Sequence, residues 1–433
     1  MRILVVGSGG REHAIVWKLA QSKMAEKIYC APGNGGIFGL AECVEISADD
    51  IEGLLDFAFV QKIDLTVVGP EAPLAKDIAG RFNEKGLRVF GPDKKGARIE
   101  SSKVFMKQLM KKNNIPTADF EVFSESERAK DYIRGLRGRF VVKADGLAAG
   151  KGVIVCDSRE EGLAAISDIM EKKVFGEAGK KVVIEECLEG EEASIIVVTD
   201  GEDAVSLVSA QDHKRLYDND KGPNTGGMGA YSPAPAVSEA LLNSIMSGII
   251  KPTIEGLREE GIIYKGALYA GLMLTASGPK VLEFNCRFGD PETQAIFPRM
   301  KSDLVDLIDS AIDDEIDIIS LQWDQRPCVS IVVVSGGYPG EYKTGFEIEG
   351  LDALKKLKDV YVFHAGTKLV QSPEPAAGRL VTNGGRVLNI TALGDSIKDA
   401  LDKCYNAVNL IDFDGMYFRR DIGYRALKKA HGV

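Results

Sequence analysis

Cysteine pairs, an excess of basic charge and long apolar runs are all missing from this chain, and each absence excludes a class of protein. The seven cysteines are scattered and contain no Cys-x-x-Cys pair, so neither a zinc site nor a disulfide framework is indicated, and a reducing compartment fits. Acidic residues outnumber basic ones by 64 to 54, which gives a formal net charge of −10. Such a chain is not expected to bind nucleic acid or acidic membranes generally, because both need a cationic surface.

The start of the chain and its hydropathy indicate a cytoplasmic protein. The sequence opens directly with a predicted strand over residues 2–7, without a signal peptide. No apolar run approaches the length of a membrane span. At 433 residues the chain is too long for one hydrophobic core, so several domains are expected.

The most informative segment is Val-Leu-Glu-Phe-Asn-Cys-Arg-Phe-Gly-Asp-Pro-Glu-Thr-Gln, residues 281–294. It reads as a strand that enters a loop, with Val281, Glu283 and Asn285 on one face. Glu283 and Asn285 therefore offer two oxygen ligands at one spot, which suits a Mg²⁺ ion that keeps its waters and bridges phosphates. Arg287 follows, placed to bind a carboxylate or phosphate with its planar fork. Glu-x-Asn by itself is also typical of an edge strand with solvated polar residues.

The loop Arg-Phe-Gly-Asp-Pro-Glu-Thr-Gln, residues 287–294, resembles the signature of the glycinamide ribonucleotide synthetase (phosphoribosylamine–glycine ligase) family. This family belongs to the ATP-grasp superfamily of carboxylate–amine ligases, and the resemblance runs from the first strand to the C-terminal region. It implies a monomer with an α/β (α+β) multi-domain fold. The domains expected are a Rossmann-like N-terminal domain (1–100), a connecting helix (101–120), an ATP-grasp small subdomain with a glycine-loop lid (121–190), an ATP-grasp large subdomain (191–325) and a C-terminal α/β domain (328–433).

The N-terminal region predicts a phosphate-binding loop. A buried strand leads into Gly-Ser-Gly-Gly-Arg-Glu-His, residues 7–13, and a helix is predicted over 14–21. A dinucleotide site is disfavoured, because Glu12 replaces the third glycine of the fingerprint and no acidic residue ends the next strand, 27–31. Parallel strands are also predicted over 65–69 and 88–91. Such glycines can simply make tight turns. In the resembled family this domain helps to bind the phosphorylated amine, and the candidates are Gly9, Gly10, Arg11 and Glu71.

Residues 140–153 predict a nucleotide grip, a strand, a flexible Gly/Ala loop and a second strand. Lys143 ends the first strand and Lys151 follows the loop, so the two lysines can cover a triphosphate and exclude water. The loop is not a Walker motif, because glycine rather than Ser or Thr follows Lys151; the alternative is a plain hairpin with exposed lysines. A helix is predicted to begin near residue 101 with a hydroxyl N-cap. The ATP contacts predicted here are Lys103, Lys143, Asp145, Gly146, Gly150, Lys151 and Gly152.

Residues 182–194 read as a strand, a short acidic linker and another strand over 193–199. Linker backbone can bind an adenine and a carboxylate can hold ribose hydroxyls, although acidic loops are often only solvated. The resembled superfamily uses this segment in that way. The predicted contacts are Glu185, Glu186, Leu188 and Glu192.

A polar segment predicts the substrate loops. Asp212, His213 and Lys214 follow a predicted strand over 206–210, and a long glycine-containing loop in an enzyme is usually functional or disordered. The backbone N–H groups of 225–229 are expected to hold a phosphate or the carboxylate of glycine. His213 is kept as a substrate-loop residue rather than a base, since the reaction needs little acid–base chemistry. The substrate contacts predicted here are Asp212, His213, Lys214, Thr225, Gly226, Gly227, Met228, Arg287 and Asp290.

One departure from the wider superfamily concerns the metal. The predicted strand over 267–275, which often supplies a further carboxylate, contains no acid. Asp212 and Asp290 are weak candidates for a second ion, so the predicted metal ligands are only Glu283 and Asn285.

The C-terminal region predicts strands over 329–334 and 360–364, a hairpin of 380–384 with 386–393, and a helix over 396–408. The turns at 336–339 and 378–379 are placed to reach the cleft, but no chemistry is assigned to them.

The reaction implied by the resemblance is the ligation of glycine to 5-phosphoribosylamine, with ATP and Mg²⁺ or Mn²⁺ as cofactors, in purine synthesis. A glycyl phosphate forms first and the amine then displaces phosphate. Lys143 and Lys151 hold the phosphates, and Arg287 stabilises the transferring phosphoryl group or the acyl phosphate. Small-molecule substrates are expected, without nucleic acid or membrane partners. The alternatives are an ATP-grasp ligase with a different acid or amine and a non-catalytic nucleotide-binding protein.

Overall fold

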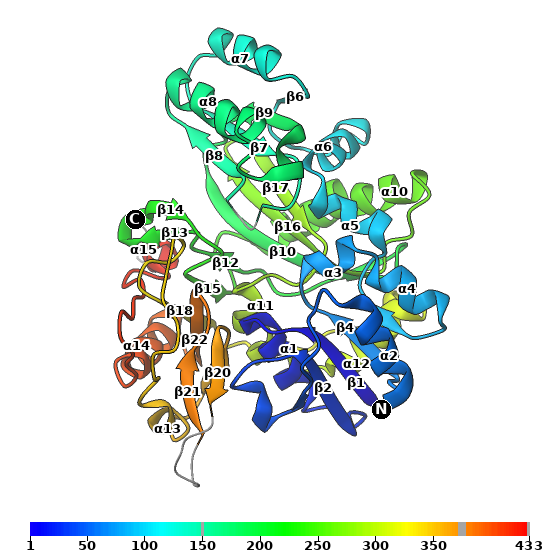
Figure 1. Cartoon of the computed structure of the whole chain (residues 1–433), viewed down its shortest axis with the longest axis vertical. Coiled ribbons are helices and arrows are strands. Elements are labelled where there is room, and N and C mark those ends of the chain that lie inside the picture. Colours follow the sequence, from blue (N-terminus) through cyan, green and yellow to red (C-terminus); the bar gives the residue numbers. More distant parts are fainter. Residues whose placement is uncertain (149–150, 371–377, 431–433) are drawn as a thin grey trace.

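The computed structural model describes residues 1–148, 151–370 and 378–430, which form a mixed α/β fold of several packed regions (Figure 1). Gly150 of the predicted lid lies outside the described residues. In the parts that are described, no helix has both the length and the apolar character needed to cross a membrane. All seven cysteines are free thiols.

The N-terminal region is a parallel sheet with strand order β3-β2-β1-β4-β5, drawn in blue in Figure 1. All but the first residue of β1 are buried, as expected for a strand covered on both faces. Its strands are β1 Arg2–Gly7, β2 Lys27–Pro32, β3 Glu42–Cys43, β4 Leu65–Val68 and β5 Val89–Phe90. Its helices are α1 Gly10–Leu19, α2 Ile51–Gln61, α3 Glu71–Ala75, α4 Ile78–Glu84 and α5 Lys94–Ser101.

Helix α1 begins at Gly10, earlier than the predicted residue 14. The Glu12 carboxylate accepts the Gly9 N–H at 2.6 Å and closes a capping box at the first turn. Glu12, which replaces the third glycine of the dinucleotide fingerprint, therefore caps the helix. It also binds the Gly9 N–H, a donor that a phosphate at this loop would need.

The small subdomain stands at the top of Figure 1 as an antiparallel sheet with order β6-β9-β7-β8. Its own apolar cluster lies between this sheet and the helices, including Ile133, Phe140 and Ile166. Its elements are β6 Phe120–Phe123, α7 Ser126–Gly135, β7 Phe140–Ala144, β8 Val153–Cys156, α8 Arg159–Ile166 and β9 Val182–Glu186. Helix α6, Lys103–Lys112, precedes it and is capped by the Ser102 hydroxyl.

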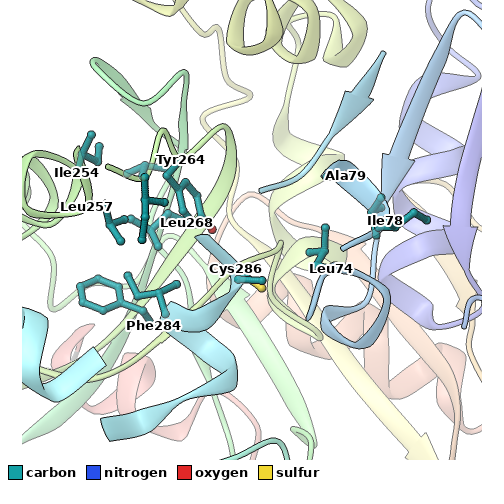
Figure 2. Packing of buried hydrophobic residues seen from close by; sticks show 14 of the residues in the cluster. Leu74, Ile78, Ala79, Ile254, Leu257, Tyr264, Leu268, Phe284 and Cys286 are labelled. Carbon is teal, nitrogen blue, oxygen red and sulfur yellow. The ribbon is translucent and has the colours of Figure 1, made fainter. Parts of the chain in front are cut away.

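The large subdomain is an antiparallel sheet with order β11-β10-β16-β17. Its core is continuous with that of the N-terminal region: Figure 2 shows Phe284 and Tyr264 from this sheet's side of the core, with Leu74 and Ile78 on the other side. Its elements are β10 Glu191–Thr199, β11 Ala204–Ser206, α9 Glu239–Ile245, α10 Lys251–Glu259, β16 Gly266–Thr275 and β17 Gly278–Asn285.

A fourth sheet, β12-β15-β18-β22-β19, joins the C-terminal region to the segment before it. Strands β12 Gln211–Asp212 and β15 Gly229–Ser232 lie within the predicted large subdomain, yet β15 pairs with β18, Cys328–Val334. The other elements include β13 Arg215–Tyr217, β14 Lys221–Asn224, α11 Glu292–Ile296, α12 Leu304–Ile312, α13 Leu351–Leu354, β19 Val360–His364, β20 Thr367–Val370, β21 Arg379–Thr382, β22 Arg386–Leu393, α14 Ile397–Val408 and α15 Tyr424–Ala430. The division into five domains stays a prediction.

Two strand predictions are wrong. Residues 206–210 do not form a strand: β11 ends at Ser206, and Ala210 makes only an isolated bridge with Ser194. The expected hairpin of 380–384 with 386–393 does not form either, because β21 pairs with β20 while β22 pairs with β18 and β19. Both errors come from partner choice, which a local hydrophobic pattern does not encode.

Candidate active site

Strand β17 places Glu283 and Asn285 on the face opposite the core. Figure 2 shows Phe284 and Cys286 within the apolar cluster, and side chains alternate along a strand. Cys286 is fixed there by Glu100, which accepts its backbone N–H at 2.8 Å. The two polar residues of the strand therefore share one face, as predicted from their spacing.

Val281 does not share that face, so this part of the prediction is wrong. Its side chain is fully buried in the same core as that of Phe284. The cause is a β-bulge: Gly271 pairs with Glu283, but the next residue, Leu272, pairs with Val281. One extra residue on β17 thus reverses the alternation before the metal pair.

The carboxylate of Glu283 lies among cations. Lys214 Nζ is 3.4 Å from Glu283 Oε1 and 3.2 Å from Glu192 Oε2. The Lys214 ammonium lowers the pKa of Glu283 to about 2; burial opposes this, and Lys143 and Lys103 reinforce it. Glu283 is therefore ionised across the pH range in which enzymes work, as a metal ligand must be.

Arg287 is held beside the metal pair by three side-chain acceptors and by the Phe288 carbonyl, to which its Nη1 donates at 3.3 Å. Its Nε donates to Glu71 Oε2 at 3.3 Å, and its Nη2 donates to Glu100 Oε1 at 3.0 Å and to Asn285 Oδ1 at 3.2 Å. Glu71, predicted as a substrate contact, is here an ion-pair partner of Arg287. Glu100 was missed, because one acid in an amphipathic helix carries no signal. Burial raises the pKa of Glu100, while Arg287 opposes that shift.

Two lysines converge on one buried carboxylate. Lys143 forms an ion pair with Glu185 and donates to the Leu282 carbonyl at 3.1 Å, next to the bulge of β17. Lys107 Nζ lies 2.5 Å from the other Glu185 oxygen, and burial lowers the pKa of Lys107 to about 8. The Glu185 carboxylate thus pairs with two lysines, and its assignment as an ATP contact stays a prediction. Lys107 was missed, although it follows Lys103 by four residues on α6 and so shares its face.

The first residues of the predicted lid are partly structural. Asp145 Oδ1 accepts from the Ser102 hydroxyl at 2.9 Å and from the Val104 N–H at 2.8 Å, so it caps α6. Lys103 donates to the Gly146 carbonyl at 3.1 Å. The Gly152 carbonyl accepts from the backbone of β7. The assignment of Asp145 as an ATP contact stays a prediction.

Strand β9 ends in an exposed carboxylate, Glu186. Glu186 accepts from Lys280 at 2.9 Å, and this hydrogen bond lowers its pKa. Leu188 is half-buried in the linker. Glu192 is the second residue of β10 and pairs with Lys214, so it lies near Glu283. The structure thus brings Glu192, but not Glu186, into the cluster around the metal pair.

The N-terminal loop meets the loop that follows β17. Arg11 donates to the Phe288 carbonyl at 3.2 Å and to Glu12 Oε1 at 2.6 Å. At Gly10 an added Cβ would lie 2.3 Å from Asn389 Nδ2, so only glycine allows this close approach. Gly9 donates its N–H to Glu12. Of the residues predicted in this domain, Arg11 and Glu71 both direct charged side chains to the loop after β17.

The backbone donors of residues 225–228 have partners within the protein. Thr225 N–H donates to the Lys214 carbonyl at 2.8 Å, and Met228 N–H donates to the His213 carbonyl at 2.8 Å. Gly227 N–H donates to Thr225 Oγ1 at 3.0 Å, and Gly226 N–H donates to a tyrosine hydroxyl at 2.9 Å. An anion held by the backbone of residues 225–229 would have to replace these bonds, and this contact stays a prediction.

His213 and Asp212 are both buried but have different neighbours. The His213 ring is fully buried and accepts the Gly423 N–H at 3.0 Å, and burial lowers its pKa. Its side chain is thus structural, and only its backbone belongs to the substrate loop. Burial raises the pKa of Asp212 well above the ordinary value, against the effect of Lys214. The candidacy of Asp212 as a second metal ligand stays a prediction.

Asp290 is also committed. Its Oδ1 accepts from Gln294 Nε2 at 2.8 Å, and its Oδ2 lies 3.1 Å from Arg386 Nη2. Burial would raise the pKa of Asp290, but Arg386 and Arg11 hold it below the usual range. Asp290 is an anchor for an arginine rather than a second metal ligand.

A cavity of about 860 Å³ lies between the small subdomain and the C-terminal region. Lys151 and β8 border it on one side, and the predicted turn at residues 336–339 borders it on the other. Arg379, from the second predicted turn, instead forms an exposed ion pair with Glu347 at 3.2 Å. Lys151 therefore faces open space beside the site rather than Glu283.

The donor set on β17 fits a hard divalent cation. A carboxylate and an amide carbonyl are ligands that Mg²⁺ accepts while it keeps water and phosphate oxygens. Within the described ranges, no group of three or more His, Cys, Asp or Glu side chains is arranged to hold a metal. An ion on Glu283 and Asn285 therefore needs its remaining ligands from water and substrate.

Family models match almost the whole chain in order. They describe the N domain of phosphoribosylglycinamide synthetase (residues 1–100), its ATP-grasp (A) domain (101–293) and its C domain (328–425). The phosphoribosylamine–glycine ligase of Caldanaerobacter subterraneus subsp. tengcongensis is 50% identical over 422 residues, which cover 98% of this chain and 99% of that protein. The chain belongs to the phosphoribosylglycinamide synthetase family.

Other members of the family agree over the full length. The phosphoribosylamine–glycine ligase of Escherichia coli (strain K12) is 50% identical over 432 residues, 99% of each chain. The crystal structure of the Thermotoga maritima phosphoribosylamine–glycine ligase has a TM-score of 0.81 at 33% identity, covering 97% of this chain and 100% of that one. The biotin carboxylase domain of the Hydrogenobacter thermophilus 2-oxoglutarate carboxylase, at 16% identity and a TM-score of 0.73, shares the fold. The expected fold class and family are confirmed.

Proposed function

We propose that the chain catalyses the ATP-dependent ligation of glycine to 5-phosphoribosylamine, giving glycinamide ribonucleotide, ADP and phosphate. One observation carries this proposal: Glu283, Asn285 and Arg287 stand together at the end of β17, with the ammonium of Lys214 3.4 Å from Glu283. The relatives that are half identical over their full length are named phosphoribosylamine–glycine ligases.

Two displacements make up the reaction. A carboxylate oxygen of glycine attacks the γ-phosphorus of ATP, the bond to the ADP oxygen breaks, and glycyl phosphate forms. The amine nitrogen of phosphoribosylamine then attacks the carbonyl carbon, phosphate leaves, and the new amide loses a proton to solvent. Both steps gain chiefly from positioning and charge neutralisation.

The chain's residues take simple roles in these steps. Lys143 binds the ATP phosphates and Lys107 fixes the carboxylate that orients Lys143. Arg287 stabilises the negative charge on the transferring phosphoryl group. Closure of the lid that carries Lys151 excludes water from the acyl phosphate. No step needs a histidine base, which agrees with the buried, low-pKa ring of His213.

When Mg²⁺ or Mn²⁺ is bound by Glu283 and Asn285, it supplies positive charge to the phosphates. The acid and the amine are the only partners proposed besides ATP. We further expect a cytoplasmic protein that is a monomer; sedimentation of the purified chain checks the oligomeric state.

The test is ADP release from Mg-ATP with glycine and freshly prepared phosphoribosylamine, together and separately. Release that requires both substrates is the expected result. If ADP is released only with a different acid or amine, the chain is a ligase but this substrate pair is wrong. If folded protein releases no ADP with any combination, the chain is not this ligase and a nucleotide-binding role is the alternative.

A further inference from the structure

Strand β22 of the C-terminal region begins with a β-bulge. Val333 pairs with Leu388 but Val334 pairs with Arg386, so Val387 is an extra residue. Val387 and Leu388 are consecutive, yet both are fully buried in the core of this region. Arg386 precedes them, so its side chain points away from that core.

The bulge turns Arg386 toward the two loops that bear the sequence motifs. Its Nη1 donates to the Gly226 carbonyl at 2.6 Å and to the Asp290 carbonyl at 3.1 Å. Its Nη2 lies 3.1 Å from Asp290 Oδ2. One planar guanidinium thus bridges the substrate loop (residues 225–228) and the loop after β17.

A second group from the same region completes the clamp on the substrate loop. The Tyr338 hydroxyl accepts the Gly226 N–H at 2.9 Å. Both backbone groups of Gly226 are therefore held by the C-terminal region. The next residue, Gly227, approaches Pro291 so closely that an added Cβ would lie 2.4 Å from its ring.

The clamped loop leads directly to the metal strand. Thr225 donates from its N–H and its hydroxyl to the Lys214 carbonyl, each at 2.8 Å. Lys214 in turn pairs with Glu283. Displacement of Gly226 therefore shifts the backbone that positions a cation at the metal pair.

We propose that Arg386 is a positioning residue for the ligation. It holds the substrate loop (residues 225–228) against Asp290, so that the acid and amine substrates are aligned with the phosphates of ATP. The C-terminal region is then part of the catalytic unit. This inference rests on the proposed function. It predicts a loss in the chemical step rather than in ATP binding, because the described partners of Arg386 are Gly226 and Asp290 and not the lysines predicted to bind ATP, Lys103, Lys143 and Lys151.

The expected kinetics follow from loss of the bridge. A misplacement of about 1 Å costs about 100-fold in rate, so Arg386→Ala should lower kcat by about that factor while KM for ATP stays unchanged. Arg386→Lys should recover part of the rate, because an ammonium still pairs with Asp290 but does not bridge both loops. Arg379→Ala is the matched control, since Arg379 is an exposed arginine of the same region with an ion pair to Glu347.

Hydrogen–deuterium exchange separates this proposal from the proposed function. In Arg386→Ala, peptides covering residues 213–229 and 287–294 should exchange faster, while peptides of the small subdomain and the thermal midpoint stay unchanged. If the wild-type protein uses a different acid or amine, the proposed substrates are wrong and the kinetic comparison is made with the substrates that it does use. The hydrogen–deuterium exchange comparison is not affected. Unchanged exchange in both peptides, a normal kcat, or a purely ATP-linked KM effect would each overturn the positioning role.

Discussion

Glutamine in place of Glu283 keeps the shape of the side chain and removes its charge. Lys214, 3.4 Å away, is the main cause that lowers the pKa of Glu283 from 4.5 to about 2. For a fully buried group this shift would correspond to ~3 kcal/mol. Because the side chain is 38% exposed, screening by solvent reduces its contribution to about 1 kcal/mol. We therefore expect E283Q to fold normally, with a small loss in the free energy of unfolding.

The pH dependence of this loss has a definite sign. The pKa of Glu283 is lower in the folded state than in the unfolded state, so its contribution is present above about pH 4.5. It is lost as the pH falls toward 2. Urea unfolding of wild type and E283Q should show a constant gap from pH 7 to 5 that narrows below that range.

The effect on turnover should be much larger than the effect on stability. Loss of a hydrogen-bond partner of a metal ligand costs about 10–100-fold in metal affinity, so loss of a ligand itself should cost at least that much. The assay is ADP release with both substrates against free Mg²⁺ at saturating ATP. Near-normal turnover at ordinary Mg²⁺, or an unshifted Mg²⁺ dependence, would refute the metal assignment.

Glu192→Gln is the matched control for this experiment. It removes the other carboxylate partner of Lys214, 3.2 Å from the ammonium, without touching β17. The Mg²⁺ dependence should stay that of wild type, although KM for ATP is free to change. An equal shift in both variants would assign the effect to the ion pair of Lys214 rather than to a ligand on β17.

Three further substitutions test separate parts of the site. Lys143→Ala should raise KM for ATP by about 10–100-fold in steady-state assays, because a hydrogen bond to a charged group contributes about 1.5–3 kcal/mol. Lys107→Ala should lower the urea midpoint, since removing one partner of the buried pair with Glu185 costs about 3–5 kcal/mol. Gly10→Ala should lower the thermal midpoint, because its Cβ meets Asn389 Nδ2 at 2.3 Å and such overpacking costs about 1–3 kcal/mol.

Each of these variants has a neutral counterpart. Lys172→Ala removes an exposed lysine of the small subdomain, and an equal rise in KM for ATP there would contradict the role of Lys143. Lys111→Ala removes an exposed lysine one turn further along α6. If the buried pair with Glu185 stabilises the fold, Lys107→Ala must lower the urea midpoint more than Lys111→Ala does. A Cβ added at Gly39 has no atom within 4 Å, so Gly39→Ala should leave the thermal midpoint unchanged. If Gly10→Ala also leaves the thermal midpoint unchanged, the predicted clash with Asn389 is wrong.

Local patterns in the sequence predicted much of the fold. The parallel strands of the N-terminal region and the strand at Val360–His364 were found from short apolar runs between turn residues. The face shared by Glu283 and Asn285 followed from the two-residue period of a strand. The family followed from a long motif, residues 287–294. These features are encoded within a few consecutive residues, so no distant partner was needed to find them.

The sequence by itself therefore determined the family, the fold class and the spacing of the proposed metal ligands. Tertiary structure alone decided that a bulge sends Val281 into the core, that Glu185 binds two lysines, and that the donors of the substrate loop are already satisfied. It also decided that Arg386 bridges two loops far from it in the chain. The physical reason is that strand register and ion pairing depend on partners distant in sequence, which leave no periodic signal along the chain.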